Sequence, residues 1–274
     1  MLSADPPIRM VICDIDGTLV RHDKSLPKEN IAALQALVGQ GLAVSLISAR
    51  PPSGMTGIAR EIGLSGPFGA FNGGTIFSAD GAIMAEHRVP DALSARLLDL
   101  YAGAGITRWL FAGGRWLASD GDNSHIPREV LSAGVEPVVT GDFTRGLADT
   151  DKLVAVCDDP GTMDRIEADA RAIVGAKATL VRSQAYYLDA TALQANKGDG
   201  VTALAALHGV SVSQVAVIGD QANDVAMFRR AGLAIAMGQA NAAVQAEAAL
   251  VAASNENAGV ADAVTRFILP RIGG

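Results

Sequence analysis

Short apolar runs that lead directly into acidic residues stand near both ends of the chain. Residues 9–14 form one such run and end at Asp14, while residues 214–219 form another and are followed by Asp220. Continuous apolar runs of this length, without alternating polar residues, are typical of strands buried on both faces of a parallel sheet. Ligands of such sheets bind outside the carboxyl ends of the strands. The pattern therefore predicts a ligand site at which these acidic residues meet.

Helical segments alternate with further buried strands around these two runs. The predicted helices are 28–40, 53–62, 198–207 and 222–230, and the further predicted strands are 42–47, 68–77, 82–85, 233–237 and 248–252. Residues 78–81 have the composition of a hairpin-like turn. An alternation of strands and helices predicts a parallel sheet covered by helices. The expected fold class is α/β, with a Rossmann-like doubly wound parallel sheet as its core.

The middle of the chain has a different pattern. Two helices are predicted there, together with five short strands, at 90–104, 160–174, 107–111, 115–118, 152–157, 179–181 and 186–188. Helices mixed with antiparallel-type strands indicate an inserted α+β domain that caps the sheet. We therefore expect a core domain formed by residues 1–83 and 189–274, and a cap domain formed by residues 84–188.

Composition excludes several classes of function. The net charge is -7 and the pI is about 5.1, which argues against nucleic-acid binding, because that needs a basic face. A basic, apolar leader and a membrane-spanning run are not expected either. Cys13 and Cys157 lie in separate apolar runs and are predicted to be buried thiols, as in a reducing cytoplasm. We expect a cytoplasmic protein, monomeric or homodimeric, that acts on a small molecule.

The acidic residues at the strand ends have a chemistry that suits a divalent cation. Asp14 and Asp16 end the first strand, and Asp220 and Asp224 follow the strand near the C-terminus. Carboxylates that converge on one crevice repel each other, and Mg²⁺, which prefers carboxylate and water oxygens, would relieve that repulsion. A single Asp-x-Asp is more simply explained as a turn or a helix cap. An acidic residue in a first helical turn also favours the helix dipole, which is the simpler explanation of Asp224.

At these residues the sequence resembles a known family. Residues 14–19, Asp-Ile-Asp-Gly-Thr-Leu, look like the first motif of the haloacid dehalogenase superfamily of phosphohydrolases, and residues 219–224, Gly-Asp-Gln-Ala-Asn-Asp, look like its fourth. Ser48-Ala49-Arg50 resembles the second motif and Asn196-Lys197-Gly198 the third. Asn72-Gly73-Gly74 resembles the Asn-Gly pair of the Cof-type branch. The long interval between the second and third motifs holds the predicted cap, an arrangement that also resembles the Cof-type phosphatases.

The resemblance implies a role for each matched residue. Asp14 would attack phosphorus and form an aspartyl-phosphate, and Asp16 would be the general acid and base. Lys197 and Mg²⁺ would neutralise the phosphoryl charge. The metal ligands would be Asp14, Asp16 through its backbone carbonyl, Asp220 and Asp224, the last through water unless it orients Lys197. The residues expected to hold the phosphate are Ser48, Ala49, Asn72, Lys197 and Asn223.

The sequence departs from the family pattern at the second motif. Family members usually carry Thr-Gly-Arg where this chain has Ser48-Ala49-Arg50. We expect Ala49 to keep an ordinary backbone conformation.

The predicted cap holds candidates for selecting the leaving group, namely Trp109, Arg115, Trp116, His125 and Arg182. Burial of these aromatic residues in the cap sheet, with the arginines exposed, would explain them as well. None of these residues identifies a substrate: sugar phosphates are favoured, and nucleotides and phosphorylated cofactors stay open.

Three functions are compatible with this pattern. A phosphomonoesterase is the leading hypothesis. A phosphomutase of the phosphomannomutase kind shares the cap position but would need basic cap residues for a second phosphate. A non-catalytic sugar-phosphate sensor on the same scaffold would be expected to lack Asp14, Asp16 or Asp220, and all three are present.

Overall fold

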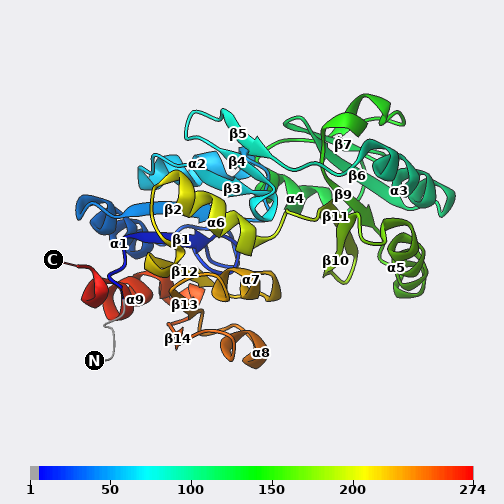
Figure 1. Ribbon diagram of the computed structural model, residues 1–274. Coiled ribbons are helices and arrows are strands. Elements are labelled where there is room, and N and C mark those ends of the chain that lie inside the picture. The colour runs from blue at the N-terminus through cyan, green and yellow to red at the C-terminus, as the bar shows by residue number, and fades with distance from the viewer. Residues whose placement is uncertain (1–5, 274) are drawn as a thin grey trace. The chain divides into compact units, whose positions relative to one another are not determined.

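The computed structural model describes residues 6–273, which form two compact units. Of these residues, the first unit takes those up to Ala49, Met55–Met84, and those from Asn196 onward, and the second takes Arg50–Gly54 and Ala85–Ala195. An eight-stranded sheet lies in the first unit and a six-stranded sheet in the second (Figure 1). Within the described residues, no helix is both long and apolar enough to cross a membrane.

The helices and strands follow the alternation that the sequence predicts at both ends of the chain. Those of the eight-stranded sheet and its helices are β1 (Met10–Asp14), α1 (Lys28–Gly39), β2 (Ala43–Ile47), α2 (Ser53–Ile62), β3 (Phe68–Ala70), β4 (Thr75–Phe77), β5 (Ile83–Glu86), α6 (Lys197–Leu207), β12 (Val215–Gly219), α7 (Val225–Phe228), β13 (Leu233–Ala236), α8 (Ala242–Gln245), β14 (Leu250–Val251) and α9 (Gly259–Ala263). Those of the six-stranded sheet and its helices are α3 (Asp91–Gly103), β6 (Thr107–Ala112), β7 (Arg115–Ala118), α4 (Ile126–Ala133), β8 (Val138–Val139), β9 (Thr150–Val156), α5 (Pro160–Val174), β10 (Ala178–Gln184) and β11 (Tyr187–Ala192).

The eight-stranded sheet has the doubly wound topology that the sequence predicts. Its strand order is β14-β13-β12-β1-β2-β3-β4-β5, and every pair from β14 to β3 is parallel. β1 lies between β12 and β2, with Cys13 opposite both Ile218 and Leu46. The chain therefore leaves β1 in one direction along the sheet and returns on its other side at β12. This is the switch point at which open α/β sheets bind ligands.

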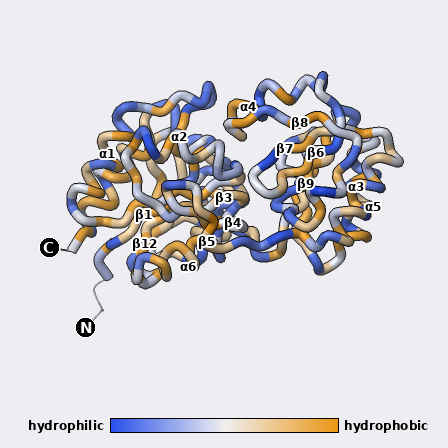
Figure 2. The backbone as a smooth tube through the Cα atoms, turned by 90° about the horizontal axis from the view of Figure 1, so that it is seen from above, coloured by the Kyte–Doolittle hydropathy of each residue, from blue (hydrophilic) through white to orange (hydrophobic). Residues whose placement is uncertain are grey.

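Apolar side chains from the strands and from helices α6, α7 and α8 form the core on one face of this sheet. Met10, Ile12, Val215 and Val217 from β1 and β12 pack with Leu204 of α6 and other side chains, and these five are fully buried. Figure 2 shows hydrophobic residues inside each unit and hydrophilic residues along the outer loops. Burial of this kind stabilises by roughly 25 cal/mol per Å² of apolar surface removed from water. The core thus fixes the strand ends that carry the acidic residues.

The second unit is an α+β domain, as expected for the middle of the chain. Its sheet order is β10-β11-β9-β6-β7-β8, and its pairs are antiparallel except β7 with β8. Its core lies between one face of the sheet and the helices α3 and α5. Helix α4 and strand β8 were not expected, because both are short: α4 spans eight residues and β8 two.

Four sequence-based expectations need correction. The run 68–77 is two antiparallel strands, β3 and β4, separated by the 3₁₀ turn Phe71–Gly73, and the helix at 222–230 is a 3₁₀ turn followed by the short α7. β11 extends to Ala192 in the six-stranded sheet, so the chain returns to the first unit after Ala195 and not at the expected boundary of 188/189. Cys157 is half-buried, whereas Cys13 is buried as predicted.

Helix α6 packs against the turn at 71–73 through glycine backbone. A Cβ atom added at Gly200 would lie 2.6 Å from Ile47 Cδ1 and 3.0 Å from the Cα atom of Gly73. The end of the Ile47 side chain would have to rotate away, and the close approach to the Gly73 backbone would push the helix or the turn back by a few tenths of an ångström. Because α6 begins at Lys197, this contact sets the distance between the third motif and the Asn-Gly turn.

We expect Gly200→Ala to lower the free energy of unfolding. Overpacking costs about 1–3 kcal/mol, which exceeds the ~1 kcal/mol that alanine gains over glycine in a helix. Gly57→Ala in α2 is the matched control, because its added Cβ meets nothing within 4 Å, and it should stabilise the protein slightly. Urea denaturation of both variants checks the prediction. Equal stabilisation by the two substitutions would contradict the packing argument.

Candidate active site

Three buried carboxylates meet at the carboxyl ends of β1 and β12. Asp14 is the last residue of β1, Asp220 follows β12, and Asp224 ends the 3₁₀ turn Ala222–Asp224. Their exposed fractions are 4%, 3% and 0%. One oxygen from each lies within 4.8 Å of one oxygen of each of the others. Adjacent parallel strands thus bring together residues that are some two hundred positions apart in the sequence.

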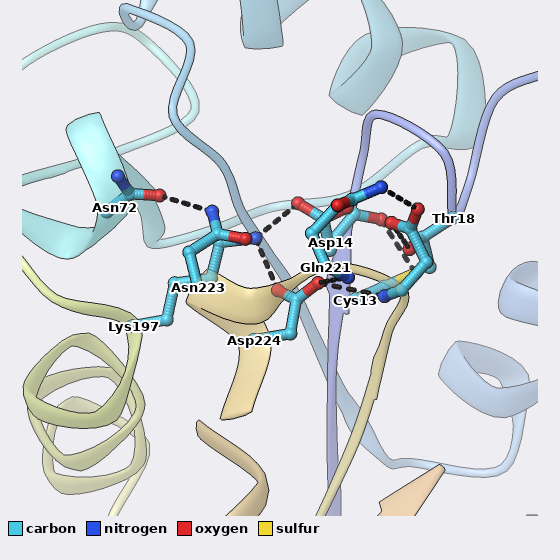
Figure 3. Close-up of polar contacts among 9 residues, drawn as sticks. Cys13, Asp14, Thr18, Asn72, Lys197, Gln221, Asn223 and Asp224 are labelled. Atoms are coloured by element: carbon cyan, nitrogen blue, oxygen red, sulfur yellow. Dashed lines mark hydrogen bonds and ion pairs between the residues drawn. The ribbon is translucent and has the colours of Figure 1, made fainter. Parts of the chain in front are cut away.

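The ammonium group of Lys197 lies between two of these carboxylates. Its Nζ donates to Asp14 Oδ1 at 2.5 Å and to Asp224 Oδ1 at 2.6 Å, and the side chain is 1% exposed (Figure 3). Lys197 is the first residue of α6, which Asn196 caps by accepting a hydrogen bond from the backbone of Asp199. The cap fixes where the helix begins and therefore where Lys197 enters the site.

Asp224 also holds the loop that carries Asp220. Its Oδ2 accepts hydrogen bonds from the backbone N–H groups of Asp220 and Gln221, both at 2.8 Å. One oxygen of Asp224 therefore orients Lys197 while the other orders the loop. Of the two roles that the resemblance implies for Asp224, this geometry matches the orientation of Lys197.

Asp220 is held in place by its own set of contacts. Thr18 Oγ1 donates to its Oδ1 at 3.0 Å, and Gln221 Nε2 donates to its Oδ2 at 3.0 Å. Gly17 turns the chain here with φ +80°, and a Cβ on it would collide with the carboxylate of Asp220. Glycine is thus required at position 17 both by its backbone conformation and by this close approach.

The electrostatics of the site show an excess of negative charge. Burial, together with the neighbouring carboxylates of Asp224 and Asp220, raises the pKa of Asp14 despite the nearby ammonium of Lys197. Burial and Asp224 likewise raise the pKa of Asp220. Burial alone would lower the pKa of Lys197, but Asp14 and Asp224 outweigh it and raise that pKa. Three carboxylates with one ammonium therefore leave negative charge that a bound cation would offset.

Hydrogen bonds link three of the residues that are expected to hold a phosphate, all of them in the first unit. Asn223 Nδ2 donates to Asn72 Oδ1 at 3.1 Å, and the backbone N–H of Asn72 donates to the carbonyl of Ser48 at 2.7 Å. Phe71 and Asn72 both have positive φ, at 48° and 60°. A bulky residue such as Phe71 rarely adopts this region, and such strain is concentrated at functional sites.

Ser48 and Ala49 follow β2 directly, and Ser48 is buried. Among the described residues, the non-glycine residues with positive φ are Lys24, Phe71, Asn72 and Ala258. Ala49 therefore has the ordinary backbone conformation that the sequence predicts. The replacement of the family's glycine introduces no strain in this loop.

Asp16 lies outside the group of three carboxylates. Its Oδ1 accepts from Lys24 Nζ at 2.6 Å, and about a third of its side chain is exposed. Its expected contribution to the metal site through the backbone carbonyl stays a prediction. Lys24, Gln221 and Gly200 are contacts of this site that sequence reasoning did not single out. Gln221 lies within the fourth-motif segment but was given no role, and Lys24 and Gly200 lie outside the motifs.

The candidate residues of the second unit divide into two groups. Trp109 and Trp116 are buried at 0% and 1% exposure, with ring centroids 5.0 Å apart, so they are part of the core of that unit. His125 is half-buried, pairs with Asp158 at 2.7 Å and stacks on Tyr186. Two arginines complete the set: Arg115 is exposed, and Arg182 forms ion pairs with Asp164 and Glu167.

Comparisons with known proteins agree with this geometry. A family model described as haloacid dehalogenase-like hydrolase matches residues 11–264. The Escherichia coli (strain K12) protein named 5-amino-6-(5-phospho-D-ribitylamino)uracil phosphatase YbjI is 25% identical over 272 residues, which cover 95% of this chain and 96% of the relative.

Solved structures show the same fold. The crystal structure of a haloacid dehalogenase-like hydrolase from Bacteroides thetaiotaomicron is 25% identical, with a TM-score of 0.88 over 94% of this chain and 99% of that one. The structure of the subclass IIB sugar phosphatase BT4131 is 21% identical, with a TM-score of 0.81 over 94% and 98% of the two chains. The family match spans nearly the whole chain and includes both acidic strand ends. The chain therefore belongs to the haloacid dehalogenase-like hydrolases, in their Cof-type phosphatase branch.

Proposed function

We propose that this protein is a Mg²⁺-dependent phosphomonoesterase that hydrolyses small phosphorylated metabolites through an aspartyl-phosphate on Asp14. The observation that supports this most is the position of Asp14, whose carboxylate contacts the ammonium of Lys197 beside two further buried carboxylates. A carboxylate can attack an anionic phosphoryl group only where positive charge is held close by. Lys197 supplies one such charge, and the donor set suits a second.

The donor set fits Mg²⁺. Asp14 and Asp220 offer carboxylate oxygens at the strand ends, the ligand type that this cation prefers, and burial together with the neighbouring carboxylates raises the pKa of both. Asp224 has both oxygens engaged by Lys197 and by backbone N–H groups, so we assign it to holding the site together. When bound, the cation would neutralise charge on the phosphoryl oxygens.

The chemistry that follows uses the residues of this chain in two steps. In the first, an oxygen of Asp14 forms a bond to phosphorus as the bond from phosphorus to the leaving oxygen breaks, and Asp16 gives its proton to that oxygen. In the second, water attacks phosphorus, its proton returns to Asp16, and the bond from Asp14 to phosphorus breaks. Inorganic phosphate and the free alcohol leave, and both aspartates regain their starting states.

Lys197 and the loops around it hold the phosphate during both steps. Lys197 stays beside the attacking oxygen of Asp14 and attracts the phosphoryl oxygens as they gather charge. Ser48, the backbone of Ala49 and the linked amides of Asn72 and Asn223 would donate hydrogen bonds to the remaining oxygens. Such donors act most strongly when they are fixed before the substrate arrives, and the contact between the two amides is one such restraint.

For the substrate we infer a phosphorylated sugar or polyol. The named relative from Escherichia coli acts on a compound with a 5-phospho-D-ribityl group, and one solved neighbour is a sugar phosphatase. We assign selection of the leaving group to the second unit. Because Trp109 and Trp116 are buried in its core, that selection falls to side chains that solvent can reach, such as Arg115 and His125.

Asp14→Asn should abolish phosphatase turnover while the protein stays folded. An amide oxygen is a poor nucleophile, and loss of a covalent nucleophile lowers kcat by about 10³-fold or more. Steady-state hydrolysis of p-nitrophenyl phosphate measures the loss, and circular dichroism verifies the fold. Asp99→Asn, an exposed aspartate on α3, is the matched control and should behave as wild type. Near wild-type turnover by Asp14→Asn would remove Asp14 from the nucleophile role.

Removal of divalent metal should stop the reaction, and Mg²⁺ should restore it. The cation should also raise the Tm of the folded protein, because a ligand at about 100 times its Kd stabilises by about 2.7 kcal/mol. Asp220→Asn should lose most of this shift in Tm, since one ligand is gone, while Asp99→Asn should keep it. Activity that survives exhaustive chelation would contradict a metal requirement.

A further inference from the structure

The loop after Asp14 carries a lysine that contacts the second aspartate of the first motif. Lys24 Nζ lies 2.6 Å from Asp16 Oδ1, and their side chains are 23% and 33% exposed. This ion pair is half-buried at the rim of the site. Neither the four motifs nor the Asn-Gly turn includes Lys24.

The backbone at Lys24 adopts a conformation that favours glycine. Its φ is +70°, and the turn closes through hydrogen bonds from Arg21 N to Ser25 O at 2.9 Å and from Lys24 N to Arg21 O at 3.0 Å. The left-handed region costs an ordinary L-residue roughly 1–2 kcal/mol. The strained backbone position is therefore the one whose side chain makes the ion pair with Asp16.

Side chains from distant parts of the chain fix this loop. Three of its carbonyl groups and one of its N–H groups are held by Gln239 (to Gly17 O, 2.5 Å), Asn30 (to Leu19 O, 2.9 Å), Asn255 (to Val20 O, 3.1 Å) and Glu256 (from His22 N, 2.8 Å). Asn30 and Asn255 are buried. The backbone between Asp16 and Lys24 is thus pinned at four points, so the ion pair joins two residues of a rigid segment.

We propose that Lys24 is a positioning residue that holds the carboxyl group of Asp16 in the orientation needed for proton transfer. The inference rests on the proposed function, in which Asp16 gives its proton to the leaving oxygen as the phosphorus–oxygen bond breaks. Lys24 takes no part in bond making. Its ammonium donates a hydrogen bond to Oδ1 of Asp16, which leaves the other oxygen to carry the proton, and the pinned loop fixes the ammonium.

The test compares two leaving groups that need a proton to different degrees. Phenyl phosphate releases a basic phenolate and depends on the general acid, whereas p-nitrophenyl phosphate releases a stabilised anion and depends on it little. Lys24→Gly is the variant to use, because glycine suits φ +70° and should preserve or raise the Tm while the ion pair is lost. We expect kcat/KM for phenyl phosphate to fall about tenfold or more, and that for p-nitrophenyl phosphate less than about threefold.

Two further variants show whether the cation itself is responsible. Lys24→Arg keeps a positive hydrogen-bond donor and should restore most of the activity toward phenyl phosphate. Lys28→Met removes an exposed lysine at the first position of α1 and should leave kcat/KM unchanged for both substrates.

The outcomes distinguish this inference from the proposed function. If Lys24→Gly lowers kcat/KM equally for both substrates, or for neither, the positioning role is overturned while the phosphatase assignment stands. Failure of Lys24→Arg to restore activity toward phenyl phosphate would also overturn it. If the wild-type protein with Mg²⁺ hydrolyses neither aryl phosphate and Asp14→Asn changes nothing, the proposed function itself fails and the role of Lys24 falls with it.

Discussion

The buried contact of Lys197 with Asp14 and Asp224 is the interaction on which the rest of the site depends. Moving an ammonium and two carboxylates out of water is expensive, and the penalty is offset only when each charge has close partners. Here the ammonium has two carboxylates within 2.6 Å, and the second oxygen of Asp224 is satisfied by two backbone N–H groups. Replacing one member would leave the others buried and unpaired. The triad and Lys197 therefore constrain each other's positions.

This arrangement is possible because of the sheet topology. β1 and β12 are parallel neighbours in register, so their carboxyl ends deliver Asp14 and Asp220 to one edge. Helix α6 must then begin beside that edge for Lys197 to reach both partners. The glycine contact between α6 and the turn at 71–73 permits that approach, since a larger residue at Gly200 would move the helix away.

The loop between Asp16 and Lys24 shows a different way of fixing a functional group. Its backbone is held by side chains of α1 and of the C-terminal segment, all far away in sequence. The site thus draws on the fold at two levels. Buried charges fix the residues that we propose to act at phosphorus, and hydrogen bonds to loop backbone fix Asp16, the residue that we propose to transfer the proton.

Much of the fold could be predicted from local patterns. Buried parallel strands appear as continuous apolar runs, which is why β1, β2, β12 and β13 were expected close to their observed bounds. The elements that were missed or misjudged lack such a signal. Helix α4 spans only eight residues, and the turn at 71–73 is defined by positive φ angles at Phe71 and Asn72, which residue types alone do not indicate. The return from the second unit was placed too early because β11 continues past Leu188 to Ala192 in its pairing with β10 and β9.

The sequence by itself determined the chemical groups: which carboxylates end strands, which lysine begins a helix, and which glycine allows the chain to turn after Asp16. These follow from residue type and local periodicity, since strand ends and helix starts are set mainly by nearby residues. Only the tertiary structure decided how the groups divide their roles. Asp224 faces Lys197 and backbone N–H groups, Asp16 faces Lys24, and the two tryptophans of the second unit are core residues. Those assignments depend on distances between residues far apart in the chain, and such distances are fixed by packing.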